Sequence, residues 1–193
     1  MRHLKCDLEL RQNISLQISN FEAQGLRLPE NGVPAAVAVI VTDLGNGAKL
    51  SGMPSYDNWM ADAALVLTRR SSKLKTHAGQ WAFPGGRIDG METSEETAIR
   101  ETREEIGLLL SESAVLGRLD DFVTRSGFLI TPVVFWAGPQ DSFEINLDEV
   151  ESVHRIPISE FLRKDAPMLD DTEGEGAPVL RMPVGDDWIA APT

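Results

Sequence analysis

Several features are scarce or absent in this 193-residue sequence, and each absence excludes a class of protein. The single cysteine, Cys6, excludes an internal disulfide and a cysteine-based zinc site. The sequence has no secretory hydrophobic region and no run of about 18 apolar residues, so we expect a soluble, cytoplasmic protein without a membrane partner. Internal repeats and low-complexity tracts are also absent.

Positive charge is scarce as well. The chain has 18 Lys and Arg against 30 Asp and Glu, which gives a formal net charge of -12. Because a nucleic-acid-binding surface normally carries a basic stripe, we expect no nucleic-acid partner. A protein with this net negative charge can act on anionic phosphate substrates only if a metal and a local basic patch make the electrostatic potential at the site positive.

Carboxylates are concentrated in one stretch, residues 86–108, which reads GRIDGMETSEETAIRETREEIGL and holds seven Asp and Glu side chains in 23 residues. Thr93 and Glu96 have the spacing of a capping box, and Gly107 stands where a C-cap glycine would end a helix. The pattern therefore predicts a helix that starts near Thr93 or Ser94 and ends before Gly107.

Three carboxylates share one side of this predicted helix. At about 100° per residue, Glu101, Glu104 and Glu105 fall together, opposite an apolar side. At this spacing they repel one another by a few tenths of a kcal/mol per pair, and a divalent cation removes that cost. Oxygen ligands suit Mg²⁺ or Mn²⁺ better than Zn²⁺. The alternative is a solvated helix face whose charges pair locally, as Arg100 would with Glu104.

The same stretch resembles the Nudix box, G-x5-E-x7-R-E-U-x-E-E-x-G-U, in which U is an aliphatic residue. The fixed positions are matched by Gly86, Glu92 and the run RETREEIGL at residues 100–108, and Thr102 replaces the usual aliphatic residue. The resemblance implies an α/β protein with the Nudix fold. This fold is an α/β/α sandwich in which helices cover a mixed β-sheet and a central loop-helix is catalytic.

The resemblance also implies a reaction, in which water hydrolyses a nucleoside diphosphate linked to another moiety with the help of Mg²⁺ or Mn²⁺. The implied metal ligands are three glutamates and a backbone carbonyl: Glu101, Glu104, Glu105 and Gly86. Arg100 would orient the glutamates, and Glu92 would support the loop. Because a glutamate beyond the box often completes such a site or acts as the base, Glu149 and Glu151 are candidates; the alternative for both is a solvated turn.

Basic residues are concentrated just before the box. They are Arg69, Arg70, Lys73, Lys75 and His77. An anionic ligand would need such a segment in an acidic protein. The alternative is a positive loop that balances the charge of the acidic helix beside it.

This basic segment also resembles the motif L-L-T-x-R-[SA]-x3-R-x3-G-x3-F-P-G-G of the coenzyme A pyrophosphatase branch of the family. Here it reads VLTRRS at 66–71, followed by Lys75, Gly79 and FPGG at 83–86. Lys75 replaces an arginine and loses the bidentate fork that suits phosphate. The implied substrate is coenzyme A or acyl-coenzyme A, cut to 4′-phosphopantetheine and 3′,5′-ADP, with the basic residues and Phe83 as substrate-binding candidates.

Other functions stay open. The box determines the chemistry and not the leaving group, so ADP-ribose, dinucleoside polyphosphates and nucleoside triphosphates are alternative substrates. A different class is a module that senses a nucleotide without cleaving it, although the complete glutamate cluster argues against this. The expected partner is in each case a nucleotide-type small molecule. The oligomeric state is open, with a homodimer as one alternative.

Around the box, the sequence predicts one domain over residues 1–193. An N-terminal extension, residues 1–31, contains a predicted helix at 7–23, with buried positions expected at Leu8, Ile14, Ile18 and Phe21. The chain stops where the C-terminal helix of the family would begin, so we expect that helix to be absent.

The apolar runs predict further elements. Segment 43–59 is predicted to be a loop, and 158–163 a short helix. Strands are predicted at 35–41, 63–70, 81–83, 114–123, 129–137, 152–156 and 179–182.

Overall fold

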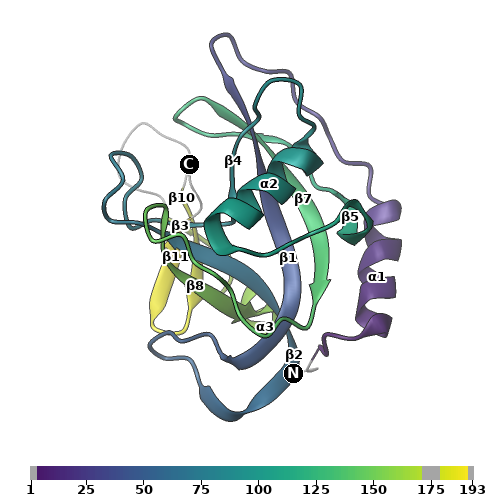
Figure 1. Cartoon of the computed structure of the whole chain (residues 1–193), viewed down its shortest axis with the longest axis vertical. Helices are drawn as coiled ribbons and strands as arrows, with labels where there is room; N and C mark the ends of the chain where they lie inside the picture. The colour runs from purple at the N-terminus through teal and green to yellow at the C-terminus, as the bar shows by residue number, and fades with distance from the viewer. Residues whose placement is uncertain (1–3, 171–178, 191–193) are drawn as a thin grey trace.

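A computed structural model of the chain describes residues 4–170 and 179–190, and strands make up most of its elements. Figure 1 shows their arrangement. In chain order the elements are α1 (Leu8–Ser19), β1 (Val33–Gly47), β2 (Ser55–Arg70), β3 (Trp81–Ala82), β4 (Gly85–Arg87), α2 (Ser94–Ile106), the 3-10 turn η1 (Glu112–Ala114), β5 (Val115–Arg118), β6 (Phe122–Val123), β7 (Phe128–Gly138), β8 (Val150–Pro157), α3 (Ile158–Phe161), β9 (Met168–Asp170), β10 (Val179–Val184) and β11 (Asp187–Ala190).

The main sheet is mixed and is built around β1. Its strand order is β3-β2-β1-β7-β5, with β4 paired to β1, β6 to β7 and β8 to β2. The β1–β7 pair is parallel, whereas β1 runs antiparallel to β2 and β4. A central strand that is covered on both faces must be apolar on both, which is why the start of β1 reads AAVAVIV at 35–41.

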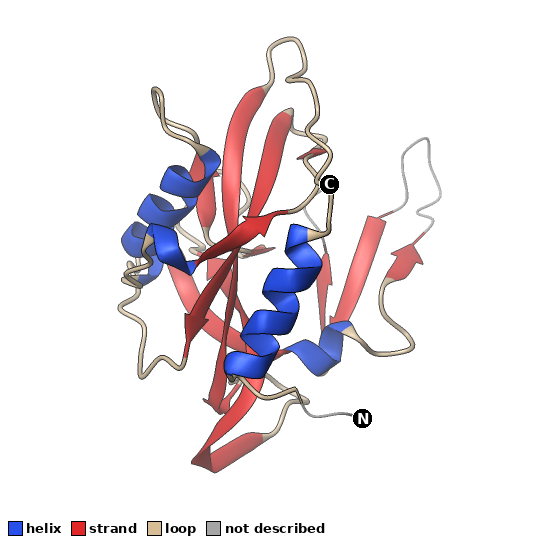
Figure 2. Ribbon diagram, turned by 90° about the vertical axis from the view of Figure 1, so that its right-hand side faces the viewer, coloured by secondary structure: helices blue, strands red, loops and turns tan. Residues whose placement is uncertain are grey.

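Two clusters of buried side chains cover the two faces of this sheet. One lies under α2 and includes Ala36 and Ile40 of β1, Phe135 of β7 and Ile106 of α2. The other joins β2 and β8 to the three-stranded sheet β11-β10-β9. Figure 2 shows the main sheet between α2 on its left and the three-stranded sheet on its right.

The predicted helix of the acidic stretch is confirmed. The hydroxyl oxygen of Thr93 accepts from the Glu96 N–H at 3.2 Å, and the Glu96 carboxylate accepts from the Thr93 N–H at 2.7 Å. These two bonds form the predicted capping box. The helix ends at Gly107, whose φ of 69° is a left-handed conformation that glycine adopts without strain.

The predicted loop at 43–59 is wrong. β1 continues to Gly47 and β2 begins at Ser55, so most of this segment belongs to a long antiparallel hairpin. The hairpin register shifts around Gly45 and Gly47, which both have positive φ. The glycines that indicate a loop in the sequence therefore mark irregularities inside a strand pair.

The predicted strand at 114–123 is also only partly right. Two short strands, β5 and β6, pair with β7 in its place. The break between them lies beside Pro132 of β7, whose carbonyl accepts from the Leu119 N–H at 3.0 Å outside the strand ladders. A proline has no N–H to donate, so the neighbouring strand is interrupted there.

The N-terminal helix forms, but over the shorter range of α1, with Asp7 as its N-cap. Of the expected buried positions, Leu8 and Phe21 are exposed, while Ile14 and Ile18 are half-buried. The reason is that α1 lies beside the short edge strand β5 (Figure 1) and not across a sheet face, so only a narrow stripe of the helix surface is covered by other residues. Among the described residues, no helix is both long enough and apolar enough to span a membrane.

Candidate active site

Strand β4 brings the start of the acidic stretch beneath helix α2. Gly86 pairs with Ala36 of β1, and a Cβ atom added at Gly86 would lie only 2.2 Å from Oε1 of Glu101. A side chain at this position would therefore occupy the space that the Glu101 carboxylate fills. The pairing of β4 with β1 thus places the Gly86 backbone directly against a predicted metal ligand.

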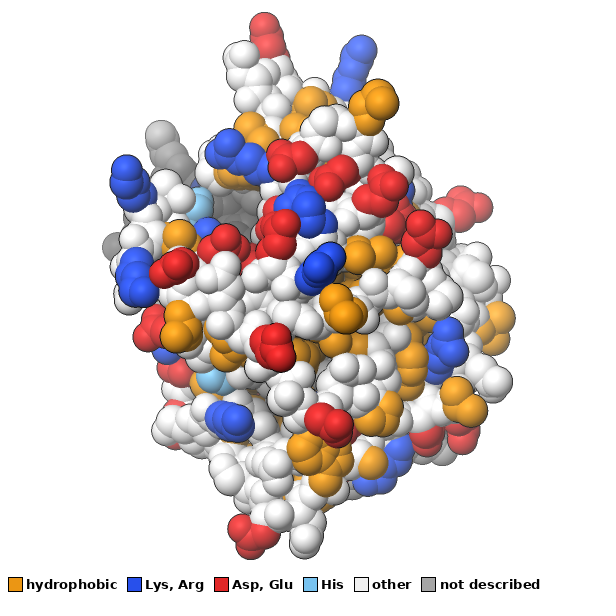
Figure 3. All heavy atoms as spheres, viewed as in Figure 1, with side chains coloured by type: hydrophobic (Ala, Val, Ile, Leu, Met, Phe, Trp, Pro, Cys, Tyr) orange, Lys and Arg blue, Asp and Glu red, His pale blue; other side chains and the backbone are white. Residues whose placement is uncertain are grey.

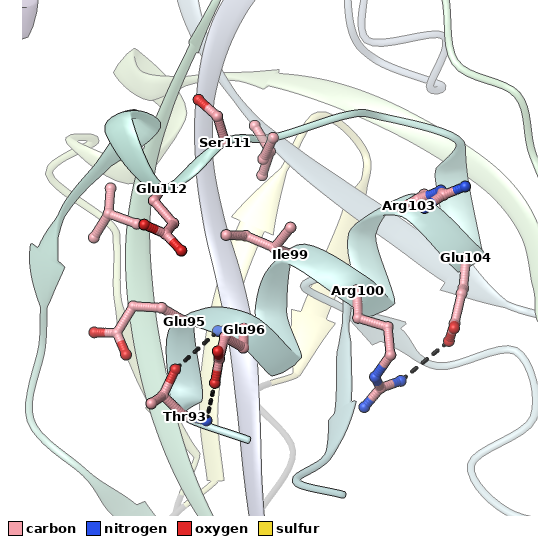
Figure 4. Close-up of a pocket in the computed structure, with 11 residues that line it drawn as sticks. Thr93, Glu95, Glu96, Ile99, Arg100, Arg103, Glu104, Ser111 and Glu112 are labelled. Atoms are coloured by element: carbon pink, nitrogen blue, oxygen red, sulfur yellow. Dashed lines mark hydrogen bonds and ion pairs between the residues drawn. The ribbon is translucent and has the colours of Figure 1, made fainter. Parts of the chain in front are cut away.

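Arg100 is the centre of an ion-pair network on α2. Its Nη1 donates to Oε1 of Glu101 at 2.8 Å and to Oε2 of Glu104 at 3.1 Å, and Figure 4 shows the second of these contacts. Its Nε donates to Oε1 of Glu92 at 2.8 Å, and its Nη2 donates to the Arg87 carbonyl at 3.1 Å. Hydrogen bonding to this guanidinium lowers the pKa of Glu92 to about 2.

Glu105 lies on the buried side of the same cluster and is only 4% exposed. Its carboxylate accepts from the Gly85 N–H, while Oε2 has no hydrogen-bond partner among the described residues. Loss of hydration on burial raises its pKa to about 8, helped by the charges of Glu101 and Glu149 and opposed by that of Arg70. A buried carboxylate with one unsatisfied oxygen is costly unless a cation or a proton is supplied.

The donor set fits a hard divalent cation. The three box glutamates and the Gly86 carbonyl offer oxygen ligands only, and Oε2 of Glu105 is a buried acceptor without a partner. However, in the described part of the chain no three acidic, histidine or cysteine side chains are already grouped so that they could hold a metal. Arg100 donates to one oxygen each of Glu101 and Glu104 and leaves the second oxygen of each carboxylate uncontacted.

The loop between β7 and β8 approaches the cluster from the other side. The N–H of Asn146 donates to the Glu105 carbonyl at 2.9 Å, and the Ser71 N–H donates to the Glu149 carbonyl at 2.9 Å. Burial is the main cause that raises the pKa of both Glu101 and Glu105, and the charge of Glu149 adds to the rise at each. Glu151 is exposed at an irregularity of the β2–β8 pairing, and no described contact joins it to the cluster.

The residues of the basic segment are divided between several places. The charge of Arg70 opposes the rise in the pKa of Glu105, and Arg70 Nε is buried without a partner among the described residues. Lys73 forms an exposed 3.4 Å ion pair with Asp148. Lys75 is exposed and has no polar side-chain partner in the described part of the chain, and His77 contacts Gln80 through Nδ1 at 3.0 Å.

Arg69 and Phe83 lie on the other side of β2 and β3. Arg69 donates through Nε to the Gly79 carbonyl at 3.2 Å, and its guanidinium lies 5.8 Å from the centre of the Trp81 ring. Phe83 packs against the buried cluster that contains Leu67 and Trp81. The structure therefore does not bring these two substrate-binding candidates to the acidic helix.

A groove of about 1140 Å³ lies along the outer flank of α2. Its apolar floor is formed by Ile99, Leu110 and Val115, and Figure 4 shows charged side chains of α2 and η1 around it. Glu104 lines it, whereas Glu101, Glu105 and Gly86 do not, so the groove meets the cluster of predicted ligands only at its edge. Figure 3 shows acidic side chains gathered over this part of the molecule, with Lys and Arg side chains toward the left where the β2–β3 loop lies.

Comparisons with known proteins agree with the geometry. A family model described as NUDIX domain matches residues 54–174. Nudix hydrolase 3 of Caenorhabditis elegans is 41% identical over 105 residues, which are 52% of this chain and 44% of that protein. An uncharacterized Nudix hydrolase NudL of Yersinia enterocolitica is 44% identical over 103 residues, 53% of each protein. The chain spans about half the length of the curated relatives it matches.

A solved structure supports the fold. The crystal structure of a MutT/nudix family protein from Enterococcus faecalis superposes with a TM-score of 0.50 and 18% identity, over 95% of this chain and 58% of that one. At this identity the likeness concerns the fold alone. Together with the family match, it confirms the predicted fold class, with a mixed curled sheet and few helices.

Proposed function

Since the chain belongs to the Nudix family, we propose that it is a hydrolase that cleaves the pyrophosphate bond of a nucleoside diphosphate derivative with Mg²⁺ or Mn²⁺. The observation that carries this proposal is the complete acidic cluster on α2, in which Oε2 of the buried Glu105 has no partner among the described residues. The matched relatives, which are named as Nudix hydrolases, also support it.

The chain's own residues suit this chemistry. Glu101, Glu104, Glu105 and the Gly86 carbonyl would hold the metal, which when bound neutralises phosphate charge and lowers the pKa of water. Glu149 lies close enough to influence Glu101 and Glu105 electrostatically, which makes it the favoured proton acceptor over the more remote Glu151. Arg100 and Glu92 fix the loop that carries Gly86 through the bond to the Arg87 carbonyl.

For the substrate we propose coenzyme A or acyl-coenzyme A. Support comes from the motif around the basic segment, and from the cations that this segment offers near the acidic cluster. Arg70 is near enough for its charge to influence the pKa of Glu105, while Lys73 and Lys75 are exposed on the adjoining loop. Arg69 and Phe83 face another part of the molecule, so we assign them no contact with the reacting phosphates.

A substrate panel tests this function. The purified chain would be incubated with Mg²⁺ and, separately, with coenzyme A, ADP-ribose, diadenosine polyphosphates and nucleoside triphosphates, and the products separated by chromatography. We expect 4′-phosphopantetheine and 3′,5′-ADP from coenzyme A as the fastest reaction. Faster cleavage of another substrate would overturn the coenzyme A assignment, and binding without any product would favour a sensing module.

The exposed Lys75 provides a sharper test of specificity. Its ammonium group has no polar side-chain partner in the described residues and is available to an anionic group that coenzyme A has and ADP-ribose lacks, the 3′-phosphate. We expect Lys75→Ala to lower kcat/KM for coenzyme A about tenfold, by loss of one charged contact, and to change ADP-ribose hydrolysis much less. Lys164→Ala, an exposed lysine after α3, is the matched control. Equal losses of kcat/KM with both substrates would mean that the basic segment attracts anionic substrates in general and does not select coenzyme A.

A further inference from the structure

We propose that the hydroxyl group of Thr102 positions Glu105 for metal binding, by supplying through one bridging water the hydrogen bond that Oε2 of Glu105 lacks. The inference rests on the proposed metal-dependent function and deepens it by adding a residue to the metal site. Thr102 would act on the cation only through Glu105, so it is a positioning residue and not a ligand.

The Thr102 hydroxyl differs from every other buried threonine hydroxyl of the described residues. Thr102 is 0% exposed, and its Oγ1 has no hydrogen-bond partner there, not even a carbonyl of its own helix. The other buried threonine hydroxyls all form hydrogen bonds, and they belong to Thr42, Thr68, Thr97, Thr124 and Thr131. Because a buried hydroxyl without a partner costs free energy, packing alone does not explain a threonine at this position.

The buried polar atoms without a partner are few and are related to one another. Among the described residues only three buried side-chain nitrogen or oxygen atoms lack one: Thr102 Oγ1, Glu105 Oε2 and Arg70 Nε. Thr102 and Glu105 belong to the same helix, and Arg70 is near enough for its charge to influence the pKa of Glu105. All three are thus linked to one carboxylate, by helix spacing or by charge.

Helix geometry brings Thr102 and Glu105 together on the buried side of α2. Residues three apart on an α-helix are neighbours, with about 5–6 Å between their Cβ atoms. A long side chain also leans toward the helix N-terminus, which directs the Glu105 carboxylate back over the turn that contains Thr102. Two hydrogen bonds through one water span about 4.5 Å between heavy atoms, so a single water can join the two oxygens.

A bridging water leaves Glu105 able to bind a cation. A carboxylate oxygen has two lone pairs, so Oε2 can accept from a water and also coordinate a metal. Hydrogen bonds of this kind fix the orientation of carboxylates that bind metals. The same helix already holds another glutamate in this way, since Oε2 of Glu92 accepts from the Thr97 hydroxyl at 2.9 Å and from Nη2 of Arg100 at 3.0 Å.

The experiment removes the two groups of the Thr102 side chain separately. Thr102→Val keeps the shape and loses the hydroxyl, whereas Thr102→Ser keeps the hydroxyl and loses the methyl group. Mn²⁺ binding to the full chain is measured by electron paramagnetic resonance of free Mn²⁺, and urea unfolding is measured on the metal-free proteins. We expect Thr102→Val to bind Mn²⁺ about tenfold more weakly than the wild type, and Thr102→Ser to stay within about twofold of it. Thr102→Ser should nevertheless unfold at lower urea, because it leaves a cavity.

Thr42→Val is the matched control for loss of a buried hydroxyl. Thr42 is also 0% exposed, and its hydroxyl donates to the Gly138 carbonyl at 2.8 Å, farther along β1 than Ala36, the partner of Gly86. We expect this variant to unfold at lower urea than the wild type and to bind Mn²⁺ equally well. It therefore separates a loss of stability from a loss of metal binding.

Equal Mn²⁺ affinity of Thr102→Val and the wild type would overturn the inference, because the hydroxyl would then be only an uncompensated polar group in the core. An affinity that follows the stability of the three proteins would overturn it as well. If Thr102→Val does not fold, Thr102→Ser is compared with Thr102→Ala, which differs from it only in the hydroxyl, and equal affinities overturn the inference. These results leave the proposed function intact, whereas a wild type that binds no Mn²⁺ contradicts both.

Discussion

Glu105 shows how one residue links the stability of the fold to the chemistry of the site. Burial raises its pKa from 4.5 to about 8. Between these pH values the folded protein binds more protons than the unfolded chain, so the free energy of unfolding must fall as the pH rises from about 4.5 to about 8. A carboxylate that is costly to ionise is thus kept where a cation would relieve the cost.

We therefore predict a pH-dependent loss of stability that belongs to this side chain. With metal removed by EDTA, urea unfolding of the wild type should show a decline on the order of a few kcal/mol between pH 5 and 8 relative to Glu105→Gln. Glu112→Gln, which removes an exposed carboxylate of η1, should follow the wild type. Parallel curves for the wild type and Glu105→Gln would contradict the raised pKa.

The contacts of a single residue could be predicted from the sequence where they follow from the spacing of residues along a helix. Glu104 and Arg100 are four residues apart, and their pairing follows from that spacing. The contact of Glu105 with the Gly85 N–H and the charge of Arg70 beside it were not predictable, because they depend on how β4 and β2 pack against α2. Arg69 precedes Arg70 in the same strand, so the alternation of side chains in a strand sends it to the opposite face.

At the scale of elements, β4 is the piece that joins the sheet to the acidic helix. Two adjacent glycines allow this contact for different reasons. A Cβ at Gly85 would meet the Ala36 carbonyl of β1 at 2.3 Å, whereas one at Gly86 would meet the carboxylate of Glu101. The first obstacle is backbone, and the second is the end of a flexible side chain.

The two alanine variants should therefore fail in different ways. Gly85→Ala should lower the free energy of unfolding by about 1–3 kcal/mol through overpacking against β1, as measured by urea denaturation. Gly86→Ala should cost less than about 1 kcal/mol and weaken Mn²⁺ binding by displacing Glu101. A loss of stability in Gly86→Ala as large as that in Gly85→Ala would show that the glycine serves the fold and not the site.

The elements that the sequence predicted correctly are those with strong local signals. Helix α2 has a capping box and a C-cap glycine, and the starts of β1 and β7 are apolar runs. The β1–β2 hairpin was missed because glycines with positive φ are tolerated at register shifts, which no local pattern distinguishes from a loop. The exposure of α1 could not be foreseen, since it depends on the place that the helix takes beside the sheet.

At the scale of the whole molecule, a buried ion pair ties together segments that are distant in sequence. Nη1 of Arg155 on β8 binds Oδ1 of Asp43 on β1 at 2.6 Å, with 8% and 1% of these residues exposed. The guanidinium lies between the rings of Trp59 and Phe143, 5.1 and 4.9 Å from their centres. Since Phe143 belongs to the loop that carries Glu149, this cluster anchors one end of that loop.

Removing one partner of this pair should be costly. Asp43→Asn would leave the Arg155 charge buried without its counter-ion, and we expect a loss of about 3–5 kcal/mol in the free energy of unfolding. The double variant Asp43→Asn, Arg155→Met should lose less than the sum of the two single variants. A loss of less than about 1 kcal/mol in Asp43→Asn, measured by urea denaturation, would mean that water already solvates the pair.

The fold class could be predicted from the resemblance to the Nudix box. That α2, the basic segment and the loop before β8 meet at the site could not be predicted from the sequence. The 146–149 region contacts both the end of α2 and Ser71 of the basic segment through backbone groups, which carry no sequence signal. The net charge of -12 likewise does not reveal the local arrangement, in which Arg100 forms ion pairs with the acidic cluster and the charge of Arg70 acts on Glu105.

The most direct test of the central claim is Mg²⁺-dependent product release from the best substrate of the panel, compared between the wild type and two glutamate variants. Glu104→Gln and Glu105→Gln should lower kcat by at least about a hundredfold, as expected when charge stabilisation in the transition state is lost, while circular dichroism shows an intact fold. Glu112→Gln should keep wild-type turnover. Unchanged turnover in both Glu104→Gln and Glu105→Gln would contradict the assignment of this cluster as the site of hydrolysis.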